Sequence, residues 1–97
     1  SDKFISVILP SKTSLNQAYP NPFNPSTTFS YVLAETNEVD LSVYSITGQL
    51  VESLVNNQQD AGSYTLVWDA SLQPSGIYFL RLQAGNETFN QKLMVIK

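Results

Sequence analysis

The sequence contains no cysteine and no histidine, and these two absences exclude most of the site chemistry available to a small domain. Without cysteine there is no disulfide, thiol nucleophile, iron–sulfur cluster or thiolate zinc site. Without histidine there is no imidazole base and no histidine metal ligand. A bound metal would therefore need oxygen ligands, as Ca²⁺ and Mg²⁺ do.

Charge is also scarce, because charged residues make up 13% of the chain and the net charge is −3. Five Lys and Arg residues give no basic surface for nucleic acid or anionic lipid. The longest apolar runs, 7–9 and 93–96, are far shorter than the roughly 20 residues of a membrane-spanning helix. No secretory signal pattern opens the sequence, so we expect the chain to be a segment of a longer protein.

Proline and glycine occupy different parts of the chain. Four of the five prolines fall within the first 25 residues, whereas all four glycines come later. Because proline lacks an N–H and fixes φ, residues 10–25 are expected to run extended over the surface, with Asn21 and Asn24 closing Asx-type turns. Residues 1–14 are interpreted as a linker, and residues 15–97 as one domain large enough for its own core.

After Pro25 the apolar residues recur at every second position, which predicts half-buried strands. Thr47-Gly48 and Gly85-Asn86 are expected to form tight hairpin turns. Strand-sized runs at this spacing indicate a sandwich, because a lone hairpin cannot bury two faces. The alternating core-facing sets are Phe29, Tyr31 and Leu33; Val39, Leu41 and Val43; Tyr64, Leu66 and Trp68; and Tyr78, Leu80 and Leu82.

Residues 48–59 depart from this pattern, since Leu50, Val51, Leu54 and Val55 follow a helical spacing. The segment is short, opens at a turn glycine and has no N-cap except Thr47. A strand is therefore favoured, and a single short helix is the alternative.

Three kinds of functional site are conceivable from the sequence, and each has a plainer structural interpretation. The eight carboxylates lie in predicted turns and at strand ends, so no catalytic pair is expected. Oxygen ligands for Ca²⁺ occur at Glu35, Asn37, Glu38 and Asp40, but not at the spacing of a known calcium loop. The aromatic residues suit a sugar-stacking platform, yet most lie in phase with the core. No cofactor or metal is expected. By elimination, the sequence is interpreted as a monomeric binding, adhesion or targeting module.

Four blocks of sequence resemble one family. They are Tyr19-Pro20-Asn21-Pro22-Phe23-Asn24-Pro25-Ser26-Thr27, Trp68-Asp69-Ala70, Ser75-Gly76-Ile77-Tyr78-Phe79-Leu80-Arg81-Leu82 and Lys92-Leu93-Met94-Val95-Ile96-Lys97. In this order, they resemble the C-terminal sorting domain of the type IX secretion system of Bacteroidetes-type bacteria, the Por secretion tail. The resemblance covers about residues 15–97.

The resemblance implies an all-β fold, an immunoglobulin-like antiparallel β-sandwich of about seven strands, without enzymatic activity. It implies an upstream cargo in the same chain, export through the periplasm, recognition by the outer-membrane translocon, and removal by a sortase-like surface protease. The cargo would be extracellular or bound to the outer surface. The residues matching the segments tied to recognition are Gly76, Ile77, Tyr78, Lys92, Leu93, Met94, Val95, Ile96 and Lys97. The family pattern starts at Tyr19, Pro20, Asn21, Pro22 and Phe23.

One departure concerns the hairpin around Thr47-Gly48. Relatives often carry an acidic residue before this turn and a basic one after it, whereas this chain has Ser45 and Gln49. A recognition role for that hairpin is therefore not carried over. The alternative function, on the same fold, is an immunoglobulin-like accessory module that binds polysaccharide or spaces domains, as in hook-capping-type domains.

Overall fold

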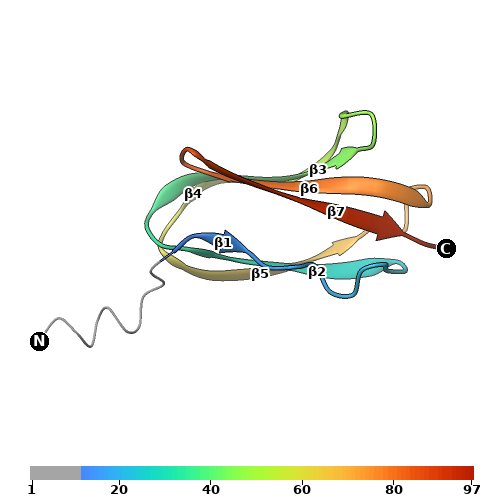
Figure 1. The fold of residues 1–97 in the computed structure, drawn as a ribbon, viewed down its shortest axis with the longest axis horizontal. Helices are drawn as coiled ribbons and strands as arrows, with labels where there is room; N and C mark the ends of the chain where they lie inside the picture. The colour runs from blue at the N-terminus through green and yellow to red at the C-terminus, as the bar shows by residue number, and fades with distance from the viewer. Residues whose placement is uncertain (1–11) are drawn as a thin grey trace, which may run out of the picture.

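The computed structural model describes residues 12–97, so the part of the predicted linker at 1–11 lies outside the described residues. Residues 12–97 form seven strands and no helix, which confirms the all-β prediction (Figure 1). The strands are β1 (Ser14–Leu15), β2 (Ser26–Leu33), β3 (Asn37–Ser45), β4 (Leu50–Gln59), β5 (Gly62–Asp69), β6 (Gly76–Ala84) and β7 (Glu87–Val95).

The strands make two antiparallel sheets that pack as a sandwich. One sheet has the order β1-β2-β5 and the other the order β4-β3-β6-β7. The pairing of β2 with β5 and of β3 with β6 is the Greek-key connectivity of immunoglobulin-like sandwiches, with β4 placed beside β3. The predicted fold class is therefore confirmed.

The core lies between the sheets and is filled by the inward positions that the alternation predicts. Side chains of β2 and β6 alternate between buried and more exposed positions, and β3 does the same except that Ser42 is also buried. The buried apolar residues are Ala18, Phe23, Phe29, Tyr31, Leu33, Val39, Leu41, Val43, Trp68, Ala70, Tyr78, Leu80, Leu82, Ala84, Leu93 and Val95.

Trp68 is the centre of an aromatic cluster in this core. Its ring centroid lies 5.9 Å from that of Phe23, 6.2 Å from Phe29 and 6.0 Å from Tyr78. Its Nε1–H donates to Glu52 Oε1 at 3.0 Å, so the one polar atom of the ring is satisfied. Because only 2% of Trp68 is exposed, it is a packing residue and offers no platform to a sugar.

The segment with helical spacing is the strand β4, as favoured from the sequence. Its pairing with β3 shifts register between Leu41 and Ser42 and again between Val43 and Tyr44. Each irregularity changes which residue faces the core, because an extra residue in one strand interrupts the alternation. Apolar pairs at 50–51 and 54–55 therefore imitate a helical stripe while the backbone stays extended.

Of the two predicted hairpin turns, the one at Gly85-Asn86 is confirmed and the one at Thr47-Gly48 has a different loop length. Gly85-Asn86 joins β6 to β7 as a two-residue loop, with Gly85 at φ 62°. The expectation of a two-residue turn at Thr47-Gly48 is wrong, since the Gly48 N–H donates to Ser45 O and the Ser45 N–H to Gln49 O. This pattern, with Gly48 at φ 91°, is a three-residue loop that ends in a glycine bulge.

Candidate functional site

The structure joins the two segments predicted to carry recognition. In the pairing of β6 with β7, Gly76 lies opposite Val95, Ile77 opposite Met94 and Tyr78 opposite Leu93. The side chains divide between two faces. Tyr78, Leu93 and Val95 are buried in the core, so they hold the strands in place. Ile77 and Met94 are half-buried and occupy the alternate positions, on the outer face of the sheet.

The segment at the start of the family pattern lies against the same end of β7. We call residues 19–25 the proline strap; its peptide bonds before Pro20, Pro22 and Pro25 are cis. The Phe23 N–H donates to Met94 O at 3.0 Å, and the Ile96 N–H donates to Phe23 O at 3.0 Å. Phe23 therefore pairs in parallel with Val95, and its side chain is buried against Trp68.

Asn21 fastens the strap by its side chain. Its Nδ2 donates to Lys92 O at 2.9 Å, and its Oδ1 accepts from the Met94 N–H at 3.1 Å. The side-chain amide thus takes the place of a peptide group in a strand pair. The expectation that Asn21 closes a local Asx-type turn is wrong, because β7 provides better-placed partners 71 and 73 residues away.

A second side-chain amide lies on β7 and bonds to the backbone of the segment just before the strap. Gln91 on β7 donates from Nε2 to Asn16 O at 2.9 Å and accepts from the Ala18 N–H at 2.5 Å. Tyr19 then pairs through its backbone with Thr28 on β2. Residues 16–23 therefore connect both sheets and cover the edge of β7, where unpaired backbone groups would otherwise face solvent.

The two lysines of the last block have different surroundings. Lys97 Nζ donates to Ser71 O at 2.8 Å, in the loop that follows β5. In that loop the Ser71 N–H donates to Asp69 Oδ1 at 2.9 Å. Hydrogen bonds from Ser71, with the Lys97 charge as a smaller contribution, lower the pKa of Asp69.

Lys92 is not at an end of its strand. From the sequence, the apolar run 93–96 predicts a last strand with Lys92 and Lys97 at its solvated ends, but β7 runs from Glu87 to Val95 and Lys92 lies within it. Its side chain is exposed on the outer face, opposite Phe79 of β6. The error arose because residues 87–91 are polar and do not extend the apolar run of 93–96.

Sequence reasoning missed several residues beside this site. On the outer face of the four-stranded sheet, Tyr44 lies opposite both Leu50 and Phe79. Arg81 Nη2 donates to Tyr44 OH at 2.7 Å, and its guanidinium lies 4.7 Å from the centre of the Tyr44 ring. The strand alternation could have identified Tyr44, Phe79 and Arg81, because they occupy the positions between core-facing residues and their side chains therefore face away from the core.

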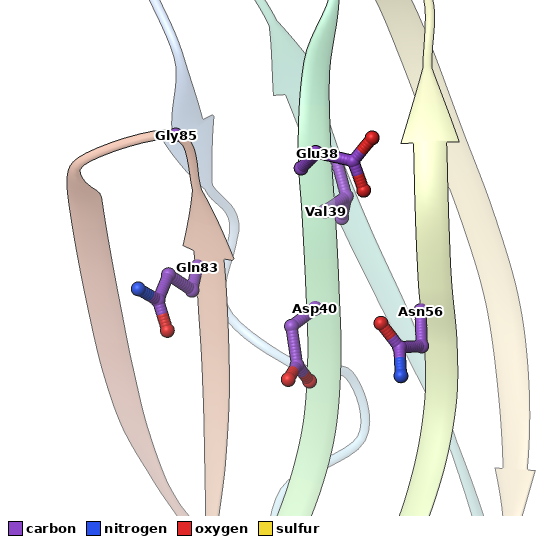
Figure 2. A pocket seen from close by; sticks show the side chains of 6 residues that line it. All are labelled: Glu38, Val39, Asp40, Asn56, Gln83 and Gly85. Atoms are coloured by element: carbon purple, nitrogen blue, oxygen red, sulfur yellow. The ribbon is translucent and has the colours of Figure 1, made fainter.

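Beyond Arg81, on the side away from Tyr44, the same face is polar and acidic. Figure 2 shows Asp40 on β3 between Asn56 of β4 and Gln83 of β6, with Glu38 above it. They line a hollow of about 140 Å³, less than the roughly 300 Å³ of a typical small-molecule pocket. Strand alternation puts Asn37 on the opposite side from Glu38 and Asp40, and residues 12–97 hold no cluster of three metal-ligating acidic side chains. The four residues considered for Ca²⁺ therefore do not converge.

Comparison with protein families matches residues 17–97 to the family described as the secretion system C-terminal sorting domain. The chain belongs to this family. Members are generally non-catalytic sorting signals of type IX secretion, attached to cargo that is secreted toward the cell surface or beyond. Membership implies interaction with the secretion machinery and with a cargo protein.

Among solved structures, the chain is similar to PorZ of Porphyromonas gingivalis, described as an essential bacterial surface component of the type IX secretion system. The TM-score is 0.60 at 18% sequence identity, over 87% of this chain and 12% of PorZ. This likeness supports the sandwich fold. Comparison with curated proteins gave no match. Among residues 12–97, no helix is long and apolar enough to cross a membrane.

Proposed function

We propose that this chain is a non-catalytic sorting signal that directs an attached cargo protein from the periplasm through the type IX outer-membrane translocon. The observation that most directly supports this proposal is the family match over residues 17–97, which spans almost the whole folded part. We further propose that the domain acts as a monomer and that a sortase-like surface protease then removes it. In this proposal residues 1–14 link the domain to its cargo, with Thr13 and Ser14 at the end of the link that is anchored on the sandwich, and residues 15–97 form the signal.

The geometry of the site supports this proposal. A receptor needs a fixed surface, and the strap holds the end of β7 by backbone bonds at Phe23 and side-chain bonds at Asn21. The proposed recognition residues with exposed or half-buried side chains are Ile77, Lys92, Met94, Ile96 and Lys97. Tyr78, Leu93 and Val95 would contribute by positioning these neighbours from within the core.

The test reverses the charge of the two lysines in this block. The variant with Lys92→Glu and Lys97→Glu is fused to a periplasm-exported reporter in a host with the type IX machinery. Both side chains are exposed, so the change should alter the free energy of unfolding by no more than about 0.5 kcal/mol each. We expect the unmodified domain to deliver the reporter to the surface and the variant to leave it in the periplasm.

The matched control carries Lys3→Glu and Lys12→Glu, which change the net charge by the same amount outside the last sequence block at residues 92–97. This control should export normally. Normal export of the Lys92 and Lys97 variant would contradict the charge role of these residues. Retention of the unmodified domain would contradict the sorting function itself.

A further inference from the structure

A row of large side chains crosses the outer face of the four-stranded sheet. Leu50 on β4 lies opposite Tyr44 on β3, Tyr44 opposite Phe79 on β6, and Phe79 opposite Lys92 on β7. We call these four residues, with Arg81, the outer patch. Leu50 is 58% exposed and Phe79 is 37% exposed, and none of the five belongs to the core cluster. Apolar or aromatic side chains aligned over β4, β3 and β6, with Lys92 next in line on β7, are more than scattered exposure, and such groups mark interaction sites.

One of the two cations in this patch, Arg81, is held in place. Arg81 donates from Nη2 to Tyr44 OH and lies over the Tyr44 ring, which fixes the plane of its guanidinium. The remaining N–H groups of a guanidinium are arranged as a planar fork that fits a carboxylate. Arg81 lies two residues from Phe79 on the same strand, so a carboxylate bound there would sit next to an apolar contact.

Charges of opposite sign follow one another along the outer face. Arg81 lies opposite Ser42, whose Oγ donates to Asp40 Oδ1, so Asp40 lies next to Arg81 on the side away from Tyr44. Glu38 lies beyond Asp40 (Figure 2), and Lys92 lies at the other side of the patch, opposite Phe79. The whole chain has a net charge of −3. A broad anionic surface such as a lipid layer would meet this overall negative charge and the carboxylates of Glu38 and Asp40, whereas a narrow segment along the row from Leu50 to Lys92 would meet Arg81 and Lys92 first. The charges therefore favour an acidic segment over an anionic surface.

We propose that the outer patch docks an extended protein segment of the secretion machinery in which Asp or Glu lies beside a large apolar side chain. The apolar side chain contacts Leu50 and Phe79, and its neighbouring carboxylates pair with Arg81 and Lys92. Glu38 and Asp40, on the side of Arg81 away from Tyr44, repel the acidic segment and so limit how far it extends along the face. This docking rests on the proposed sorting function and names the partner chemistry of that site.

The first arm of the test measures reporter export with two variants of the 97-residue chain, Phe79→Ser and Arg81→Gln. Each should lower the amount of reporter at the surface about tenfold, as loss of a central interface contact does. Val67→Ser removes another exposed apolar side chain, on β5, and Lys12→Gln removes another exposed cation. Both controls should export like the unmodified chain, and melting curves verify that all four variants fold.

The second arm identifies the occupant by photocrosslinking from Leu50→p-benzoylphenylalanine in the exporting host. We expect an adduct whose partner peptide, sequenced by mass spectrometry, carries Asp or Glu next to an apolar residue. Adding Arg81→Gln should remove that adduct. An adduct with lipid or lipopolysaccharide, a partner peptide without acidic residues, or no adduct at all would overturn the docking proposal.

The two proposals fail in different ways. Export of folded Phe79→Ser and Arg81→Gln at the level of the unmodified chain overturns the docking site and leaves the sorting function intact. Failure of the unmodified chain to export overturns the sorting function, and the docking site with it.

Discussion

Neighbouring residues on β6 show how strand alternation assigns roles to single side chains. Tyr78 is 6% exposed and contacts Trp68 in the core, while Phe79, next to it, is 37% exposed on the outer face. The Tyr78 hydroxyl donates to Pro74 O at 2.7 Å, which satisfies its polar atom near the protein surface. Tyr78 therefore contributes to the core and Phe79 to the outer surface, because the Cβ atoms of adjacent strand residues point to opposite faces.

Trp68→Ala should be among the most destabilising single substitutions in the chain. It removes ring contacts with Phe23, Phe29 and Tyr78 and leaves Glu52 without its partner. We expect a loss of about 3–5 kcal/mol, measured by urea unfolding followed by circular dichroism. Leu72→Ala is the control, because Leu72 is 93% exposed and should change stability by less than about 0.5 kcal/mol. Equal unfolding midpoints for the two variants would contradict the packing role of Trp68.

Asp69 should make folding stability depend on pH at the acidic end. Hydrogen bonds from Ser71 lower its pKa in the folded state below the ordinary value of 3.8. The carboxylate therefore contributes stability that is present above pH 3.8 and is lost as the pH falls through the lower folded value. In Asp69→Asn this contribution is absent at every pH.

The measurement compares urea unfolding of the parent and Asp69→Asn between about pH 6 and about pH 2.5. The parent should be the more stable protein at the upper end, and the difference should shrink on acidification. A difference that stays constant over this range would show that Asp69 has the same pKa in the folded and unfolded states.

At the scale of elements, hydrogen bonds join β7 to the strap and to residues 16–18 just before it. These bonds connect the two ends of the folded chain. Side-chain amides of Asn21 and Gln91 provide the bonds at positions where no regular strand pair exists. A proline-rich segment lacks the donors of a regular strand, since each proline removes an N–H. Amide side chains supply the missing donors and acceptors and so protect the edge of β7.

Asn21→Ala tests this arrangement. It removes the bonds to Lys92 O and the Met94 N–H, and two hydrogen bonds of this kind contribute about 1–2 kcal/mol together. We expect the free energy of unfolding to fall by that amount and amide exchange at Met94 to accelerate. Asn24→Ala is the matched control, because Asn24 is exposed on the same strap and makes neither bond. Similar exchange rates at Met94 in both variants would show that the amide does not fasten β7.

At the scale of the whole molecule, the folded unit extends beyond the segment matched by the family. Thr13 is buried, and its Oγ1 accepts from the Ala34 N–H at 3.0 Å. Ser14 and Leu15 pair with Val32 and Tyr31 of β2. These contacts tie residues 13–15 to the sandwich, whereas the family match begins at residue 17.

If the domain is removed on export, the cut should fall before Thr13. Proteases act on segments outside packed structure, and bond cleavage after Thr13 would require β1 to leave β2. The measurement is intact mass spectrometry of a reporter fused to the full chain and recovered from the cell surface. A reporter that ends between residues 13 and 97 would contradict this prediction, and a reporter that keeps all 97 residues would show that no removal occurs.

The sequence by itself determined the strands and most of the core. Alternation at Phe29, Tyr31 and Leu33 identifies buried positions because it records which way each side chain faces within one strand. The same rule marks Tyr44 and Phe79 as outward, although their partnership across strands depends on register. The β4 segment was harder to interpret because irregular pairing with β3 interrupted its alternation.

Only the tertiary structure decided how the ends of the domain meet. Asn21 and Lys92 lie 71 residues apart, and no local pattern connects them, because their bond depends on the closing of both sheets. Phe23 became a core residue for the same reason, since the strap brings it onto Trp68. Local periodicity specifies the face of each strand, whereas the site needs the positions of β2, β6 and β7 relative to one another, and those positions are set by packing of the whole core.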